Sequence, residues 1–219
     1  MSDAVDKAVR SALLEAERRF AATMPPGAEA TLAAFVAELI RWNRSVNLTA
    51  IDDPASVGEL HLLDSLAVVG HVPDGSLVAD VGTGGGFPGV PLAVARPDVQ
   101  VDLLDRTEKK ILFLKTTLAR LGIANGRARH VRLEGRREAE NLPLYDVAIS
   151  RAFTAPPEWL RLARNYVRPG GRILTMLGAE RPEPVAWQEA LGADRLIADL
   201  SYQLPSGQKR GLLVVELAG

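Results

Sequence analysis

A glycine-rich segment near the middle of the chain is the stretch best suited to bind a ligand. Between Asp80 and Gly89 the sequence reads DVGTGGGFPG, with five glycines among the last eight residues. Glycine permits tight turns and lets backbone N–H groups approach a ligand closely. Pro88 suits the first turn of a following helix, whose positive end would face the segment. Five glycines exceed the needs of a simple turn, so the segment predicts a ligand-binding loop.

Two ligand classes fit this loop, a dinucleotide and S-adenosylmethionine. Three glycines of the loop match the dinucleotide pattern G-x-G-x-x-G. Both classes expect an acid at the end of the second strand to bind the ribose hydroxyls, and Asp105 satisfies both. Asp80 favours S-adenosylmethionine, because its carboxylate suits an ammonium and a sulfonium but would repel a pyrophosphate. Gly82, Gly84 and Gly86 are the candidate loop contacts.

The loop lies within an alternation of predicted strands and helices. Strands are expected at 77–79, 99–104, 129–133, 145–150 and 172–177, and helices at 88–96, 107–121 and 156–167. This alternation predicts a parallel sheet with helices on both faces. Two further strands, at 196–204 and 211–217, flank a short turn and predict an antiparallel hairpin. Methyltransferase sheets end in such a hairpin, whereas dinucleotide-binding domains usually continue in parallel.

The predicted fold is therefore α/β, a Rossmann-like class I S-adenosylmethionine methyltransferase with a mostly parallel seven-stranded sheet and a C-terminal hairpin. Amphipathic helices are expected at 4–22, at 28–44 and after Pro54. We interpret residues 1–72 as a helical extension packed on the core and residues 73–219 as the methyltransferase domain.

Composition narrows the function classes. The 219 residues are 47% hydrophobic and 24% charged, which excludes disordered and fibrous classes. No apolar run is long enough for a membrane span, and the first residues do not resemble a secretory signal, so we expect a cytoplasmic protein. Cysteine is absent, which excludes disulfides and a thiolate nucleophile. We expect no bound metal.

The net charge of −1 conceals a segregation of charge along the chain. Residues 1–72 carry six Lys/Arg and ten Asp/Glu, whereas residues 106–172 carry fifteen Lys/Arg and six Asp/Glu. The two segments therefore have net charges of −4 and +9. The basic segment surrounds the expected site and could follow a phosphate backbone, or it could be a solvated face. Candidate RNA contacts are Lys109, Lys110, Lys209 and Arg210.

The absence of cysteine and of one known tetrapeptide also restricts which atom can accept the methyl group. Methylation of carbon 5 of cytosine needs a thiolate, and methylation of exocyclic amines usually uses an Asn/Asp-Pro-Pro-aromatic tetrapeptide. That tetrapeptide follows the fourth strand, and after the fourth predicted strand this sequence reads Ser150-Arg151-Ala152-Phe153 instead. An acceptor with its own lone pair, such as guanine N7, needs no protein base, so catalysis would consist mostly of orientation. N7 would have to be reached in an RNA loop or by extruding the base.

Several motifs together resemble the RNA small-subunit methyltransferase G family, also called glucose-inhibited division protein B. They are Trp42-Asn43 with Asn47-Leu48-Thr49, His61-Leu62-Leu63-Asp64-Ser65-Leu66, the loop from Asp80 to Gly89, and Ile149-Ser150-Arg151-Ala152-Phe153. His61 and Asp64 lie one helical turn apart, which fits packing onto the sheet as well as substrate contact. Phe153 could stack on the target base or belong to the core.

The resemblance implies methylation of guanine N7 at position 527, in the 530 loop of 16S rRNA, with S-adenosylmethionine as donor and S-adenosylhomocysteine as product. It implies cofactor contacts at Gly82, Phe87, Leu133, Glu134 and Arg151. Arg151 is also the candidate catalytic residue. The partner would be 16S rRNA within the small subunit or an assembly intermediate, and we expect a monomer. A small-molecule methyltransferase and a non-catalytic, cofactor-binding RNA-assembly factor are the alternatives.

Overall fold

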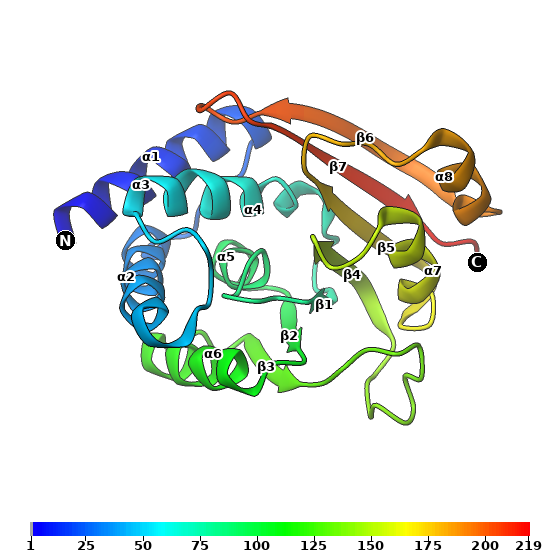
Figure 1. The fold of residues 1–219 in the computed structure, drawn as a ribbon, viewed down its shortest axis with the longest axis horizontal. Coiled ribbons are helices and arrows are strands. Elements are labelled where there is room, and N and C mark those ends of the chain that lie inside the picture. The colour runs from blue at the N-terminus through cyan, green and yellow to red at the C-terminus, as the bar shows by residue number, and fades with distance from the viewer. Residues whose placement is uncertain (1) are drawn as a thin grey trace.

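One mixed sheet of seven strands organises the computed structural model, which describes residues 2–219 apart from the side chain of Ser2 (Figure 1). The strand order is β3-β2-β1-β4-β5-β7-β6. The first five strands pair in parallel, and β7 is antiparallel to both of its neighbours. The predicted mostly parallel sheet with a C-terminal hairpin is confirmed. Its strands are β1 (Leu77–Val81), β2 (Gln100–Asp105), β3 (Gly126–His130), β4 (Tyr145–Arg151), β5 (Val167–Leu177), β6 (Arg195–Gln203) and β7 (Lys209–Glu216).

Helices cover both faces of the sheet (Figure 1). On one face, α5 (Gly89–Ala95) and α6 (Glu108–Leu121) pack on the sheet. Outside them, α2 (Ala28–Val46) packs on α5 and α6, and α1 (Ser2–Phe20) packs on α2. The other face packs against α7 (Pro156–Ala163) and α8 (Pro184–Leu191). Between α2 and β1 the chain forms one continuous helical segment and a short turn. These are α3 (Pro54–Ser56), the π-helix η1 (Val57–Leu63), α4 (Asp64–Leu66) and the 3₁₀ turn η2 (Val69–His71).

Alternating strand residues divide the core into two layers. In β4, Val147 and Ile149 belong to the layer under α5 and α6, whereas Ala148 between them belongs to the layer under α7. This follows from the period of two in a strand, which sends successive side chains to opposite faces. The first layer also contains Val5 and Phe35, so α1, α2 and the sheet share one continuous core. The domain boundary at residue 72 stays a prediction.

Four elements differ from the sequence-based prediction by three residues or more. β3 covers 126–130 rather than 129–133, because it pairs with β2, and Asp105, the last residue of β2, lies opposite His130. α7 ends at Ala163, and the Pro-Gly-Gly expected to stop a helix lies within β5. There the register shifts, because Tyr145 pairs with Val167 and Val147 with Arg172, which makes a bulge. The helix α8 was not predicted.

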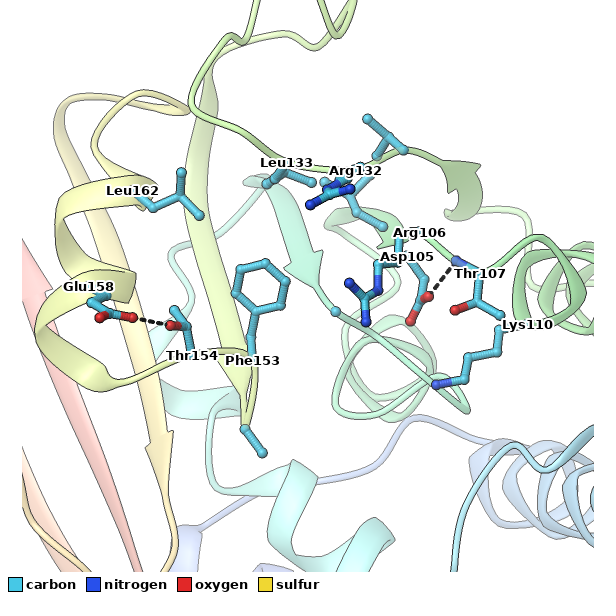
Figure 2. Close-up of a pocket in the computed structure, with 14 residues that line it drawn as sticks. Asp105, Arg106, Thr107, Lys110, Arg132, Leu133, Phe153, Thr154, Glu158 and Leu162 are labelled. Atoms are coloured by element: carbon cyan, nitrogen blue, oxygen red, sulfur yellow. Dashed lines mark hydrogen bonds between the residues drawn. The ribbon is translucent and has the colours of Figure 1, made fainter.

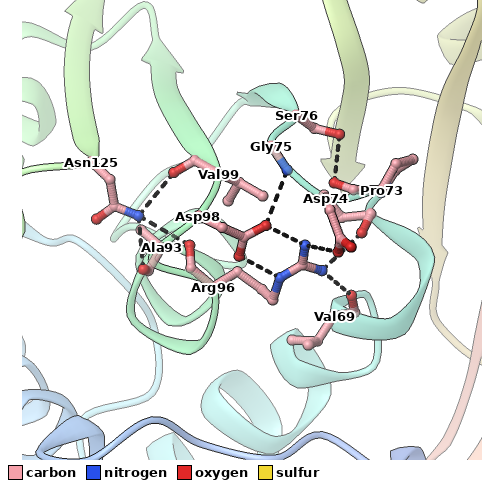
Figure 3. A network of polar contacts seen from close by, with 11 residues as sticks. Val69, Pro73, Asp74, Gly75, Ser76, Ala93, Arg96, Asp98, Val99 and Asn125 are labelled. Carbon is pink, nitrogen blue, oxygen red and sulfur yellow. Dashed lines mark hydrogen bonds and ion pairs between the residues drawn. The ribbon is translucent and has the colours of Figure 1, made fainter.

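A polar network ties together the chain segments at the amino ends of β1 and β2 (Figure 3). The guanidinium of Arg96 donates to the carbonyl of Val72 at 2.8 Å and to the carboxylates of Asp74 and Asp98. Asp98 in turn accepts from the backbone N–H of Gly75 at 3.0 Å. This network fixes the segment before β1 to the loop before β2. It lies at the amino ends of the strands, and the glycine loop lies at their carboxyl ends.

Candidate active site

Two cavities open along the carboxyl ends of the parallel strands, where ligands bind in sheets of this kind. One has a volume of about 600 Å³ and contains Asp105; we call it the Asp105 cavity. The other has a volume of about 550 Å³ and contains Arg151; we call it the Arg151 cavity. Gly82, Ala152 and Thr154 line both. The two cavities therefore meet beside the glycine loop.

Asp80 holds the glycine loop from inside. Its side chain is completely buried, and Oδ2 accepts hydrogen bonds from Thr83 Oγ1 at 2.5 Å and from the backbone N–H of Gly89 at 2.8 Å. Burial raises the pKa of Asp80 to about 6. A Cβ on Gly89 would lie 2.1 Å from a methyl of Leu103, so only glycine fits there. Asp80 lines neither cavity, and its expected contact with the cofactor stays a prediction.

Asp105 connects the glycine loop to the start of α6. Its Oδ2 accepts from the backbone N–H of Gly84 at 3.0 Å. Its Oδ1 accepts from the backbone N–H of Thr107 at 2.8 Å (Figure 2). Each carboxylate oxygen has a further lone pair for a ligand hydroxyl. Lys110 reaches into the same cavity, with its Nζ 3.9 Å from the position of a Cβ on Gly84. Lys109 beside it is exposed and lines neither cavity.

Apolar side chains form part of the wall opposite Asp105. Leu133 and the ring of Phe153 line it, facing Asp105 across the opening (Figure 2). The ring covers Gly82 so closely that a Cβ there would lie 2.8 Å from it. Glu134 points elsewhere, because its carboxylate pairs with Arg132 and with the next arginine along the loop. Leu133 thus reaches the cavity as expected, but the Glu134 side chain does not line it.

A left-handed turn separates the two walls that follow β4. Ala152 has a φ of 54°, which is uncommon for a residue with a side chain. Arg151 before it lines one cavity and Phe153 after it lines the other. The turn therefore places a guanidinium and an aromatic ring on either side of the point where the cavities meet.

In the Arg151 cavity the guanidinium is held by backbone and side chain together. Arg151 donates to the carbonyl of Leu60 at 3.3 Å and lies 3.2 Å from Nδ1 of His61. The His61 ring stacks on Phe87 with centroids 4.9 Å apart, and its Nε2 lies 2.8 Å from Thr49 Oγ1. Burial, followed by the charge of Arg151, lowers the pKa of His61 to about 4. His61 is therefore neutral at pH 7, and Nδ1 accepts from Arg151.

A second buried carboxylate anchors this arrangement. Asp64 is 2% exposed and accepts from the hydroxyl of Tyr202 at 2.8 Å. Guanidinium nitrogens of Arg151 and Arg210 each lie 3.6 Å from its Oδ2. Burial raises the pKa of Asp64, and the two arginines oppose that rise. Two guanidinium groups share one carboxylate, which leaves positive charge to meet an electron-rich ligand.

Comparison with known proteins assigns the chain to a family. The family model GidB, described as rRNA small subunit methyltransferase G, matches residues 28–206. The chain belongs to this family. It is 44% identical over 183 residues to the ribosomal RNA small subunit methyltransferase G of Myxococcus xanthus, covering 82% of this chain and 83% of the relative. The corresponding Anaeromyxobacter protein (strain Fw109-5) is 41% identical over 204 residues, covering 92% of this chain and 94% of the relative.

Solved structures show the same fold at low identity. An O-methyltransferase from Bacillus cereus in complex with SAH aligns with a TM-score of 0.59 and 19% identity, covering 84% of this chain and 90% of that chain. TrmN from Thermus thermophilus aligns with a TM-score of 0.56 and 21% identity, covering 71% of this chain and 48% of that chain. The predicted Rossmann-like methyltransferase fold is confirmed.

Most residues predicted for the site of this methyltransferase G family member lie at the two cavities. Gly82 lines both, Asp105 and Leu133 line the first, and Gly84, Phe87 and Arg151 line the second. Gly86 instead lies against α6 and α5, because a Cβ there would be 2.9 Å from Leu114 and Val90. Of the predicted RNA contacts, Lys110 and Arg210 line cavities, whereas Lys109 and Lys209 are exposed outside them.

Two features of the site were not assigned from the sequence. The spacing of His61 and Asp64 was compatible with packing, and both side chains contact or pair with Arg151. Glu180 lines the Arg151 cavity, and its only sequence signal is its place just beyond a strand end. Within residues 2–219, no cluster of three or more metal-binding side chains is present, and no helix could cross a membrane.

Proposed function

We propose that this protein transfers a methyl group from S-adenosylmethionine to N7 of guanine 527 in 16S rRNA. The observation that carries the proposal is the meeting of the Asp105 and Arg151 cavities at Gly82, in a member of the rRNA small subunit methyltransferase G family. A methyl donor in one cavity and an acceptor in the other would approach each other beside the glycine loop. The relatives' names state rRNA small-subunit methylation, and the guanine N7 target extends them.

The residues of the Asp105 cavity fit an adenosyl group. Asp105 has two carboxylate oxygens, each with a lone pair left for a ribose hydroxyl. Leu133 and Phe153 offer an apolar wall for a base, and the positive φ of Gly82 and Gly84 opens the loop beside them. When bound, S-adenosylmethionine supplies an electrophilic methyl group on a sulfonium.

The Arg151 cavity suits an acceptor that carries its own lone pair. His61 is neutral, but both of its ring nitrogens already have partners, Thr49 and Arg151. Asp64 is occupied by Tyr202 and two arginines. Neither of these two buried groups is free to remove a proton. Glu180 also lines the cavity, but guanine N7 has no proton to lose and needs no base. The task of Arg151 is then orientation, by donating to an acceptor atom of the base or its phosphate.

Exposed cations beside the two cavities fit a nucleic-acid partner. Lys109 and Lys209 are exposed, and each is next in sequence to a cation that lines a cavity. Cations placed this way would follow the backbone of the rRNA that enters the site, and binding would weaken with salt. We propose a monomer acting in the cytoplasm on the small ribosomal subunit or on an assembly intermediate.

The test is methyl transfer by the purified protein. Small subunits from a strain that lacks the gene are incubated with methyl-labelled S-adenosylmethionine, and the nucleosides of 16S rRNA are separated. The expected product is labelled 7-methylguanosine at position 527. Transfer to a metabolite fraction instead would show a small-molecule methyltransferase. Donor binding without transfer to any ribosomal particle would show a non-catalytic assembly factor.

A further inference from the structure

Glu180 is a carboxylate in the Arg151 cavity that has no partner among the residues the structure describes. It follows β5 and lines the cavity, and its side chain is exposed. No hydrogen bond or ion pair joins it to any residue of the described chain. The other carboxylate that lines this cavity, Asp64, is buried and bound by Tyr202 and two arginines. Glu180 therefore remains available for a ligand.

The segment that carries Glu180 is anchored to the C-terminal hairpin. Arg181 pairs with Asp199 at 2.7 Å and donates to the carbonyl of Leu200 at 2.8 Å. Its guanidinium also lies against Gly211, where a Cβ would be 3.1 Å away. Because the neighbouring arginine is directed to β6 and β7, it leaves Glu180 unpaired and fixes the backbone that presents it.

Three different groups that follow neighbouring strands line the Arg151 cavity. β4 lies between β1 and β5, with Val81 opposite Ser150 and Ser150 opposite Thr175 (Figure 1). Gly82 follows β1, Arg151 ends β4, and Glu180 lies beyond β5. Adjacent strands are about 4.8 Å apart, so the span from β1 to β5 is about 10 Å. Glu180 lies three residues past the end of β5 and lines the same cavity of about 550 Å³, which has room for a purine between these groups.

The edge of guanine offers a matching order of groups. Going around the ring, N7 and O6 are acceptors, and N1–H and N2–H₂ are donors. A guanine with N7 turned to Gly82, where the two cavities meet, would turn O6 toward the guanidinium of Arg151 and its two donors toward Glu180. Two hydrogen bonds of Arg151 go to Leu60 and His61, and a guanidinium has five N–H donors.

We propose that Glu180 is the residue that selects guanine, by accepting hydrogen bonds from N1–H and N2–H₂ of the extruded base. The inference rests on the proposed function, because it presumes that guanine N7 is the acceptor. Adenine is rejected at both positions, since it carries a donor where guanine has O6 and an acceptor where guanine has N1–H. Reading the Watson–Crick edge is the usual way to recognise a flipped base.

The test compares guanosine with inosine, which lacks the N2 amine, at the target position of reconstituted small subunits. A hydrogen bond to a charged group typically contributes enough for wild-type kcat/KM to favour guanosine about 10-fold or more. Glu180→Ala is expected to methylate guanosine at least about 10-fold more slowly and to lose most of the preference over inosine. Glu183→Ala is the matched control, because Glu183 is exposed nearby and does not line the cavity.

The outcomes separate the two hypotheses. Absence of 7-methylguanosine with the wild-type protein would refute the proposed function itself. Normal wild-type activity combined with an unchanged guanosine preference in Glu180→Ala would overturn the assignment of Glu180 alone. Affinity for S-adenosylhomocysteine is measured for each variant, and an unchanged value shows that the variant is folded with an intact donor site.

Discussion

The change Asp105→Asn tests how the end of β2 supports the donor site. The native carboxylate accepts from two backbone N–H groups, those of Gly84 and Thr107, with one oxygen each. An asparagine side chain has almost the same shape but only one oxygen. Whichever way it lies, its NH₂ group faces a backbone N–H donor, so one hydrogen bond is lost and two donors are brought together. The glycine loop or the start of α6 must then move.

The magnitude follows from the kind of bond lost. A hydrogen bond to a charged group typically contributes about 1.5–3 kcal/mol. If a ribose hydroxyl also bonds to Asp105, the same change removes part of the donor's binding energy. We therefore expect affinity for S-adenosylhomocysteine to fall by about 10- to 100-fold. We also expect the free energy of unfolding to fall by about 1–3 kcal/mol.

Isothermal titration calorimetry and denaturant unfolding measure the two effects of Asp105→Asn. The matched control is Asp98→Asn, because Asp98 also accepts from a backbone N–H, that of Gly75, at the opposite edge of the sheet. The control should lower stability without changing affinity for S-adenosylhomocysteine. Unchanged affinity in Asp105→Asn would refute the placement of the donor beside Asp105.

Four further predictions concern other residues of the site and the fold. Arg151→Lys keeps the charge but replaces the planar fork, whose two nitrogens reach Leu60 and His61, with a single nitrogen. Methyl transfer should fall at least about 10-fold with S-adenosylhomocysteine binding intact, and wild-type turnover would remove Arg151 from the site. Lys110→Ala should weaken S-adenosylhomocysteine binding, because the Nζ of Lys110 lies over the glycine loop. Lys109→Ala should change only RNA binding, by lowering the slope of log affinity against log salt concentration by about 1. Equal effects of the two variants on S-adenosylhomocysteine affinity would contradict this. In the folded protein His61 stays neutral down to about pH 4, whereas in the unfolded chain it is protonated below its ordinary pKa. The free energy of unfolding of the wild type relative to His61→Gln should therefore fall by up to about 3 kcal/mol as the pH drops from 6.5 to 4. A difference that does not change with pH in unfolding experiments would count against a buried neutral histidine. Arg96→Ala should cost about 2 kcal/mol of unfolding free energy without affecting methyl transfer, and a loss below about 0.5 kcal/mol would show that the network in Figure 3 is marginal.

Local sequence patterns predicted the features that depend on local physics. The glycine loop between β1 and α5, the acid at the end of β2 and the hairpin are each encoded within short stretches. The ends of strands and the position of the bulge were less predictable from the sequence, because they depend on the partner strand. The end of β3 is set by the end of β2 at Asp105, and the start of β5 by a register shift opposite Tyr145.

The contacts that organise the Arg151 cavity join distant parts of the chain. Asp64 and Tyr202 are 138 residues apart, and Arg151 and His61 are 90 residues apart. No periodicity or motif length predicts such pairs, because they arise only when the hairpin and the π-helix η1 pack beside the end of β4. The contacts of Asp80 were not predicted either. Its carboxylate accepts hydrogen bonds from Thr83 and Gly89 inside the glycine loop.

The fold also shows which charges of the basic segment are already paired, and a count along the sequence cannot show this. Several of its arginines are paired inside the protein, such as Arg129 with Asp102, Arg164 with Asp194 and Arg168 with Asp146. These cations contribute to the net charge of the segment but are already occupied. The charge available to a ligand is therefore smaller than the count suggests. Lys110 of this segment lines a cavity, and so does Arg210 of β7, which lies outside the segment and pairs with Asp64.

Nucleoside mapping of 16S rRNA by mass spectrometry tests the central claim most directly. Ribosomal RNA is compared from the parent strain, from a strain lacking the gene, and from the deletion strain supplied with the wild-type or the Arg151→Ala gene. The account predicts that 7-methylguanosine at position 527 disappears with the gene, returns with the wild-type copy and does not return with Arg151→Ala. Full methylation at that position in the deletion strain would contradict it.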